Sequence, residues 1–197
     1  CSISVLRNEF LALANLRHPG LATVHDFGMD RETSELYFTC EYVDGRDLLT
    51  ACQDFDLLRG TGLTDFLALI VQLLRSLEYI HSRGLVHGDL KPANILVAEV
   101  ERNGAKECVG KLIDFGLTTR EKNFSGRRLI GTAYYIAPER VMGSQIDRRT
   151  DLYSFGALLY RLVTGRVPFQ GKSKLVVLKG HMEGTPLMPL DIVPSLP

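Results

Sequence analysis

The sequence predicts an α+β protein in which strands come early in the chain and helices dominate the rest. Two observations support this fold class. Residues 21–28 are expected to form a strand and its exit, and residues 36–43 are rich in aromatic and β-branched side chains, which is typical of a second strand. Apolar residues then recur at helical spacing after Thr64 and again after Asp151, which predicts two long buried helices.

Composition describes an ordinary globular protein. Of 197 residues, 45% are hydrophobic, and 23 basic residues balance 23 acidic ones, so charge gives no argument for a nucleic-acid partner. No apolar run reaches the roughly 18 residues that a membrane span needs. Four scattered cysteines show neither zinc nor disulfide spacing and favour a reducing, cytoplasmic location. The chain lacks an initial Met, so we expect a fragment of a longer protein fused to further domains.

The first elements are short. Apolar residues from Leu6 to Leu16 have helical spacing, and 17–20 (Arg-His-Pro-Gly) ends that helix. The two strands follow, and Asp44-Gly45 closes the second. A short helix is expected from Asp47 to about Ala51.

The long helices have recognisable ends. Thr64 is the predicted N-cap of the first, and Gly84 is its glycine stop. Asp151 is expected to open the second, which Gly165 closes. Residues 117–130 read as an exposed loop, and a last helix is expected near 172–178.

A hairpin is predicted between these helices. Residues 95–98 and 109–113 form its strands, and Arg102-Asn103-Gly104 is a turn signal. The two free ends of the hairpin would bring Asn94 and Asp114 to neighbouring positions.

These side chains suit phosphoryl transfer. That chemistry needs metal ions on the phosphates, a carboxylate that orients the attacking hydroxyl, and positive charge. Asp89 could accept the hydroxyl proton, and Asn94 and Asp114 offer the hard oxygen ligands that Mg²⁺ prefers. Either local motif alone, Asp-Leu-Lys-Pro or Asp-Phe-Gly, would more often be an ordinary turn or loop.

Four motifs in order make that ordinary explanation untenable, and together they resemble the catalytic domain of a eukaryotic-type serine/threonine protein kinase. They are His87-Gly88-Asp89-Leu90-Lys91-Pro92-Ala93-Asn94, Asp114-Phe115-Gly116, Gly131 to Ala137-Pro138-Glu139, and Asp151-Leu152-Tyr153-Ser154-Phe155-Gly156. The amino-acid sequence at 41–48 and 86–94 is most similar to that of kinase domains of large bacterial multidomain regulators.

The resemblance implies a protein-kinase-like two-lobed fold. Residues 1–43 would be a small-lobe remnant with the hinge, comprising helix C and about two strands. Residues 44–197 would be most of a mainly helical large lobe, incomplete at its C-terminus.

The resemblance also implies the catalytic roles. Asp89 would be the base, and Lys91 would reach the transferred phosphoryl group and indicates serine/threonine specificity. Asn94 would be a catalytic residue and, with Asp114, would hold Mg²⁺. Thr132 would hydrogen-bond Asp89 and Lys91.

ATP would lie in the cleft between the lobes. The residues implied in its binding are Glu9 (which pairs with the ATP-positioning lysine), Glu41 and Val43 of the hinge, Asp47 at the ribose, Leu96 under adenine, and Asp114. Cys40 would be the gatekeeper, and Leu13, His87 and Phe115 would stack as a spine. For Asp47, a helix N-cap is an equally good reading.

Three departures from the family pattern matter. Gly88 replaces the arginine that usually precedes the catalytic Asp and pairs with an activation-loop phosphate, so we expect activity without phosphorylation of Thr118, Thr119 or Ser125. No glycine-rich loop or strand lysine precedes Glu9, so the chain as given is expected to transfer phosphate poorly. The usual arginine partner of Glu139 is missing, which predicts a costly unpaired charge and marginal stability.

Two other functions are compatible with parts of this pattern, beside a kinase acting on protein serine or threonine. A pseudokinase that serves as a regulatory binding module is the alternative, but Asp89, Asn94 and Asp114 are all intact. A small-molecule phosphotransferase is disfavoured by Thr132 and the 137–139 segment, since that loop holds a peptide substrate in the family. The residues before Cys1 would discriminate the kinase from the pseudokinase.

Overall fold

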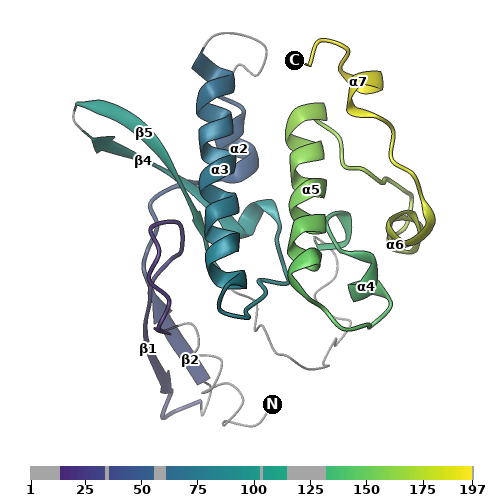
Figure 1. Ribbon diagram of the computed structural model, residues 1–197. Coiled ribbons are helices and arrows are strands. Elements are labelled where there is room, and N and C mark those ends of the chain that lie inside the picture. The colour runs from purple at the N-terminus through teal and green to yellow at the C-terminus, as the bar shows by residue number, and fades with distance from the viewer. Residues whose placement is uncertain (1–13, 34–35, 56–60, 103, 115–131, 197) are drawn as a thin grey trace.

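The computed structural model describes residues 14–33, 36–55, 61–102, 104–114 and 132–196. Within them the predicted α+β class is confirmed, with few strands and mainly helical content. Two long helices, α3 (Thr61–His81) and α5 (Arg148–Thr164), stand side by side in Figure 1. The strands lie beside α3, as does the short helix α2 (Leu48–Cys52), while the helices that follow α5 in the chain lie beyond it.

The first two strands form a separate antiparallel pair. They are β1 (Val24–Met29) and β2 (Leu36–Cys40), with Phe27 opposite Phe38. Both predicted strands exist, but each is shorter than predicted. Every residue of β2 from Tyr37 to Cys40 is exposed, so this ribbon contributes little to the core.

The second sheet carries the predicted hairpin. Its strand order is β3 (Arg46–Asp47), β4 (Ile95–Arg102) and β5 (Ala105–Leu112), all antiparallel. The strands run further than predicted, because pairing continues to Arg102 opposite Ala105. Gly104 has a φ of 75°, a left-handed conformation that glycine adopts without strain, and this confirms the turn.

The predicted stripe of α3 is the centre of the core, but its predicted start was wrong. Thr64 is not the N-cap, because the helix begins one turn earlier at Thr61 and continues through Gly62. The stop is confirmed, since Gly84 has a φ of 70° and its amide donates to the His81 carbonyl. The stripe residues that are buried are Phe66, Ile70, Leu73, Leu77 and Ile80.

The start of α5 was also predicted wrongly. The N-cap is Asp147, whose side chain accepts from the Arg149 amide in a capping box with Thr150. Asp151 therefore lies in the first turn and does not open the helix. Gly165 closes α5 as predicted, with a φ of 71°.

The remaining elements are short. They are α2 (Leu48–Cys52), the 3₁₀ turns η1 (Pro92–Asn94) and η2 (Thr132–Tyr134), α4 (Pro138–Val141), α6 (Lys174–Glu183) and α7 (Pro189–Ile192). Helix α6 begins at its Ser173 cap and runs beyond the predicted 172–178. The predicted helix before Leu16 lies largely outside the described residues, and the predicted loop at 117–130 lies wholly outside them.

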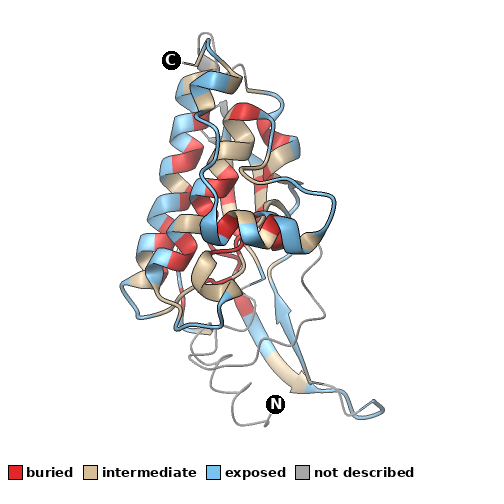
Figure 2. Cartoon of the chain, turned by 90° about the vertical axis from the view of Figure 1, so that its right-hand side faces the viewer, coloured by how far each residue is buried: buried red, intermediate tan, exposed pale blue. Residues whose placement is uncertain are grey.

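One core joins α3, α5 and the hairpin. Ile95 and Leu112 at the base of the hairpin and Leu158 of α5 are fully buried against the α3 stripe. Figure 2 shows the buried positions gathered where the helices meet, with the strands near the N-terminal end mostly exposed. Gly110 allows the close approach of β5 to α3, because a β-carbon there would lie 2.8 Å from the side chains of Leu69 and Leu73.

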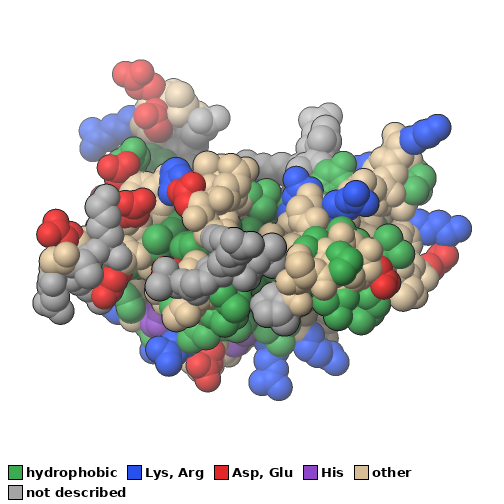
Figure 3. Space-filling model, turned by 90° about the horizontal axis from the view of Figure 1, so that it is seen from above, with side chains coloured by type: hydrophobic (Ala, Val, Ile, Leu, Met, Phe, Trp, Pro, Cys, Tyr) green, Lys and Arg blue, Asp and Glu red, His purple; other side chains and the backbone are tan. Residues whose placement is uncertain are grey.

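The surface agrees with the balanced composition. On the face seen in Figure 3, acidic and basic side chains are interspersed around the rim, with apolar groups between them. Among the described helices, none is long and apolar enough to cross a membrane.

Candidate active site

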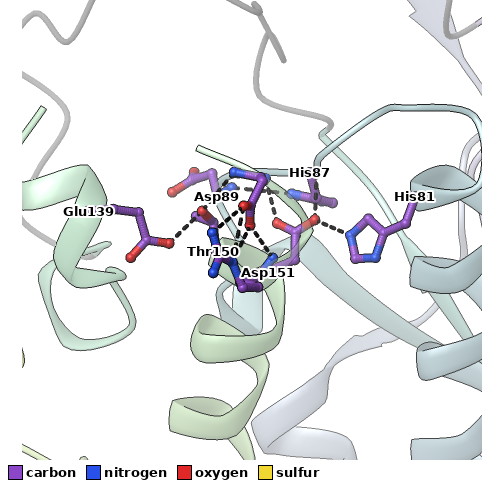
Figure 4. A network of polar contacts seen from close by, with 9 residues as sticks. His81, His87, Asp89, Glu139, Thr150 and Asp151 are labelled. Atoms are coloured by element: carbon purple, nitrogen blue, oxygen red, sulfur yellow. Dashed lines mark hydrogen bonds and ion pairs between the residues drawn. The ribbon is translucent and has the colours of Figure 1, made fainter. Parts of the chain in front are cut away.

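The loop that carries the predicted catalytic residues is anchored on a buried carboxylate. Asp151 has no exposed surface, and its Oδ2 and Oδ1 accept hydrogen bonds of 2.8 and 2.7 Å from the amides of His87 and Gly88. His81 Nε2, at the end of α3, donates to the same carboxylate at 2.7 Å. Figure 4 shows this convergence of α3, α5 and the loop. Charge-assisted bonds of this length are strong in a buried setting.

The loop backbone turns at Gly88. Its φ of 76° lies in the left-handed region, where a side chain would be strained. The departure from the family pattern at this position therefore has a local structural benefit, because glycine adopts the required turn without cost.

His87 is held in one neutral form. It is fully buried, its Nδ1 accepts from the Asp89 amide at 3.4 Å, and its Nε2 therefore carries the hydrogen that points at the Ile113 carbonyl 3.3 Å away. Burial lowers the pKa of His87 and outweighs the neighbouring Asp151 carboxylate and Ile113 carbonyl, which raise it. His87 thus links the loop to the strand that leads to Asp114.

The three predicted catalytic side chains are brought together. Lys91 Nζ lies 2.6 Å from Asp89 Oδ2, and the two side chains are 26% and 22% exposed, so the carboxylate is held and still reachable from solvent. Asn94 is buried, and its Nδ2 donates to the Asp89 carbonyl at 2.9 Å and to Oδ2 at 3.4 Å.

The hairpin delivers Asp114 beside Asn94, as predicted. The Ile113 amide donates to the Asn94 carbonyl at 2.9 Å, so Asp114 follows directly from that contact. Asp114 is exposed and has a φ of 47°, which is uncommon for a residue other than glycine. Backbone strain of this kind is often found at functional sites.

The donor set fits a hydrated magnesium ion. Asn94 uses its amide nitrogen on Asp89, so its oxygen faces away and can coordinate, and Asp114 supplies a carboxylate. Within the described residues, no three His, Cys, Asp or Glu side chains cluster as a metal cage. Mg²⁺ commonly needs only one or two protein ligands when phosphate and water complete its shell.

Glu41, the predicted hinge residue, is bonded on three sides to neighbouring segments. Its amide donates to the Thr23 carbonyl at 2.7 Å, its Oε2 accepts from the Thr23 amide at 3.1 Å, and its Oε1 accepts from Lys111 Nζ at 2.5 Å. Burial alone would raise the pKa of Glu41, but the hydrogen bonds from Lys111 and Thr23 outweigh it and lower that pKa. A nucleotide contact at Glu41 is therefore left to its carbonyl oxygen.

The other predicted nucleotide residues form a row on the sheet. Leu96 of β4 pairs with Asp47 on one side and with Lys111 on the other. Asp47 is the N-cap of α2, because its Oδ1 accepts from the amides of Leu49 and Thr50 and its Oδ2 from the Thr50 hydroxyl. The N-cap reading is confirmed, while the ribose contact stays a prediction. Val43 is half-buried just before this row.

Some predicted residues cannot be placed. Outside the described residues lie Glu9, Leu13, Phe115, Thr118, Thr119 and Ser125, and the side chain of Thr132 is likewise not described. Cys40, the predicted gatekeeper, is exposed at the end of β2.

The expected cost at Glu139 was wrong. This carboxylate is half-buried and accepts a hydrogen bond of 2.6 Å from the Thr150 hydroxyl, so it is not an unpaired buried charge. The reason is the capping box of α5, whose Thr150 faces α4.

Sequence reasoning missed the anchoring role of Asp151. The available signal was an acidic residue directly beside the apolar positions of a buried helix, but an acidic first turn is also an ordinary helix start. Lys111 was missed as well, because its partner Glu41 is 70 residues away in the chain.

Comparisons with known proteins agree with this geometry. A family model described as the protein kinase domain matches residues 2–190. A probable serine/threonine-protein kinase of Streptomyces coelicolor is 38% identical over 96% of this chain and 28% of its own length. The serine/threonine-protein kinase PknF of Mycobacterium tuberculosis is 34% identical over 94% of this chain and 38% of its own length.

A third relative broadens the comparison. The DNA damage-responsive serine/threonine-protein kinase RqkA of Deinococcus radiodurans is 36% identical over 96% of this chain and 28% of its own length. The chain thus spans about 28 to 38% of the length of these three curated relatives.

Proposed function

Since this chain belongs to the protein kinase family, we propose that it is the catalytic core of a serine/threonine protein kinase. It transfers the γ-phosphoryl group of ATP to serine or threonine hydroxyls of a protein substrate. The observation that carries the proposal is the solvent-reachable Asp89 carboxylate, with Lys91 at 2.6 Å, Asn94 beside it and Asp114 next to Asn94.

Each catalytic side chain has a distinct task. Asp89 orients the substrate hydroxyl and takes its proton, and its accessible Oδ atoms suit that role. Lys91 supplies positive charge next to the attacking oxygen. Mg²⁺ and ATP, when bound, supply charge neutralisation and the phosphoryl group, and Asn94 and Asp114 are the residues that would hold the metal.

The nucleotide residues keep their predicted roles within this proposal. The hinge at Glu41 and Val43 presents backbone groups to adenine, and Leu96 lies beneath it. Asp47 can contact the ribose while it caps α2, because among the described residues its Oδ2 accepts only from the Thr50 hydroxyl and has a second lone pair for a ribose hydroxyl. Glu9 pairs with the ATP-positioning lysine.

The proposed organisation follows the family. Residues 1–43 belong to the small lobe and hinge, and residues 44–197 belong to the large lobe. We propose a cytoplasmic location, which suits the four scattered cysteines. We also propose that the domain is part of a longer protein, because the curated relatives extend well beyond the matched region.

The test is phosphate transfer from ATP to a generic basic protein by the complete natural protein that carries this chain. Asp89→Ala should lower turnover by about 10²- to 10⁴-fold, because a positioned base is removed. Asp191→Ala, an exposed acidic residue of α7, is the control and should leave turnover unchanged. If the wild-type protein binds Mg²⁺–ATP and transfers nothing, the proposal is wrong and a regulatory pseudokinase replaces it.

A further inference from the structure

An arginine from another element lies near Gly88. A β-carbon built on Gly88 would lie 3.7 Å from Nη1 of Arg140 and 3.8 Å from Cδ1 of Ile146. Both are ordinary van der Waals distances, so a side chain of one carbon would have room at residue 88 and would touch the guanidinium. Arg140 belongs to α4, which follows Ala137 without a break.

The guanidinium lies among three carboxylates. Burial lowers the pKa of Arg140, while attraction to Asp89, Asp151 and Glu139 raises it, with Asp89 the strongest of the three. An arginine side chain stays charged in such surroundings. Its positive charge therefore acts on the group proposed as the catalytic base.

The support behind Arg140 is rigid. Glu139, its neighbour in α4, is bonded at 2.6 Å to Thr150 in the first turn of α5. The next residue of α5, Asp151, holds the amides of His87 and Gly88. Figure 4 shows Glu139, Thr150, Asp151 and Asp89 within this one network. Helix α4 and the catalytic loop are thus fixed to the same helix end.

We infer that Arg140 is a positioning residue for Asp89, supplying from α4 the guanidinium that related kinases carry at the position of Gly88. The inference rests on the proposed kinase function. Asp151 fixes the backbone at Gly88, and Lys91 and Asn94 both contact Oδ2 of Asp89. The Arg140 guanidinium adds a positive charge from another element, which favours one direction of the same carboxylate. Arg140 lies directly after the 137–139 segment, which is the proposed peptide-binding segment, so it connects that segment to the loop that carries Asp89.

The experiment compares Arg140→Met, Arg140→Lys and Arg148→Met in the complete natural protein. Methionine keeps most of the length of the arginine side chain but carries no charge. Lysine restores the positive charge but lacks the planar guanidinium with its paired N–H donors. Arg148, exposed at the start of α5, is the matched control. We measure kcat, KM for ATP, the melting midpoint, and amide hydrogen exchange at Gly88 and Asp89.

Arg140→Met should lower kcat by about tenfold or more with KM for ATP within twofold, since a misdirected carboxylate impairs chemistry and not nucleotide binding. Arg140→Lys should recover at least part of kcat, and Arg148→Met should match wild type. Amide exchange at Gly88 and Asp89 should speed up in Arg140→Met alone.

Three results would overturn the inference. They are an unchanged kcat in Arg140→Met, a loss that follows a lowered melting midpoint and is not relieved by lysine, and an equal loss in Arg148→Met. If the wild-type protein is inactive, the proposed function fails on its own. Exchange at Gly88 and Asp89 then decides whether Arg140 holds the loop, and unchanged exchange refutes it.

Discussion

The catalytic loop and the β1–β2 ribbon lie at opposite extremes of burial. His87 and Asp151 have no exposed surface and Asn94 has 3%, whereas Tyr37, Phe38 and Tyr42 are 48%, 50% and 87% exposed. The loop is held by buried polar bonds to Asp151, more than 60 positions away. Among the described residues, the ribbon is tied to the rest by the bonds of Glu41, which follows β2, and by backbone bonds of Gly20 and Ala22, which precede β1, to Leu112. The proposed chemistry is thus built on a rigid base, and the proposed hinge on a lightly held one. Substitutions in the first region should cost far more than substitutions in the second.

The largest effect should come from Asp151→Asn. The new amide turns an N–H group toward backbone donors, so at least one buried donor loses its acceptor and the hydrogen bond from His81 weakens. We expect the free energy of unfolding to fall by about 3 kcal/mol or more, with phosphate transfer lost. Urea unfolding and a transfer assay measure the two effects.

Asp147→Asn is the matched control on the same helix. Asparagine caps a helix as well as aspartate does, so the free energy of unfolding should change by less than about 0.5 kcal/mol. If both variants lost the same unfolding free energy, the burial of Asp151 would not explain the large effect expected there.

Much of the rigid base was predictable because its signals are local. The turn at Gly104, the glycine stops at Gly84 and Gly165, and the apolar stripe of α3 are all readable from neighbouring residues. The hairpin in turn predicts that Asn94 and Asp114 meet, which the Ile113–Asn94 bond confirms.

What the sequence missed has two causes. The starts of α3 and α5 were placed about one turn late, at Thr64 and Asp151, because Thr and Asp are common caps and the chain offers a second Thr or Asp upstream, at Thr61 and Asp147. The other misses depend on distant residues. Two contacts could not be predicted without the folded structure. They are the bond of Glu139 to Thr150 and the approach of Arg140 to Gly88. No local pattern distinguishes a packed arginine from a solvated one.

A smaller effect should follow from Gly88→Ala. Alanine at a φ of 76° costs about 1–2 kcal/mol of unfolding free energy, although its β-carbon would have room. Gly156→Ala, in the middle of α5 with open space around it, should instead stabilise by up to about 1 kcal/mol. Thermal melts of the two variants should shift in opposite directions, and a shift in the same direction would show that the loop is not held in its left-handed turn.

The smallest effect should come from the hinge pair. Glu41→Gln and Lys111→Met should each cost no more than about 1 kcal/mol, because the partly exposed pair is screened by water. A double-mutant cycle isolates the coupling between the two side chains. If the coupling free energy were as large as the loss in Asp151→Asn, the hinge pair would contribute as much stability as the buried loop anchor, contrary to the comparison made above.

Acid should remove the contribution of Glu41. Its pKa is lowered below the ordinary 4.5, so the folded state favours the ionised form. The stabilisation is full above pH 4.5 and is lost as the pH falls through the lowered value. Unfolding free energies measured from pH 6 downward should therefore decline less steeply in Glu41→Gln than in wild type, and parallel curves would contradict the assignment.

The hairpin also has a consequence for how the protein folds. The contact that brings Asn94 to Asp114 closes a short stretch of chain, from 94 to 113, whereas the bond of His87 to Asp151 spans 64 residues. Since the entropy of loop closure grows with the logarithm of length, the longer closure costs about 1 kcal/mol more. Asn94 and Asp114, the proposed metal ligands, can therefore come together early, from the most local contacts of the site, while the contact of Asp151 with the loop that carries Asp89 must wait for α5 to dock.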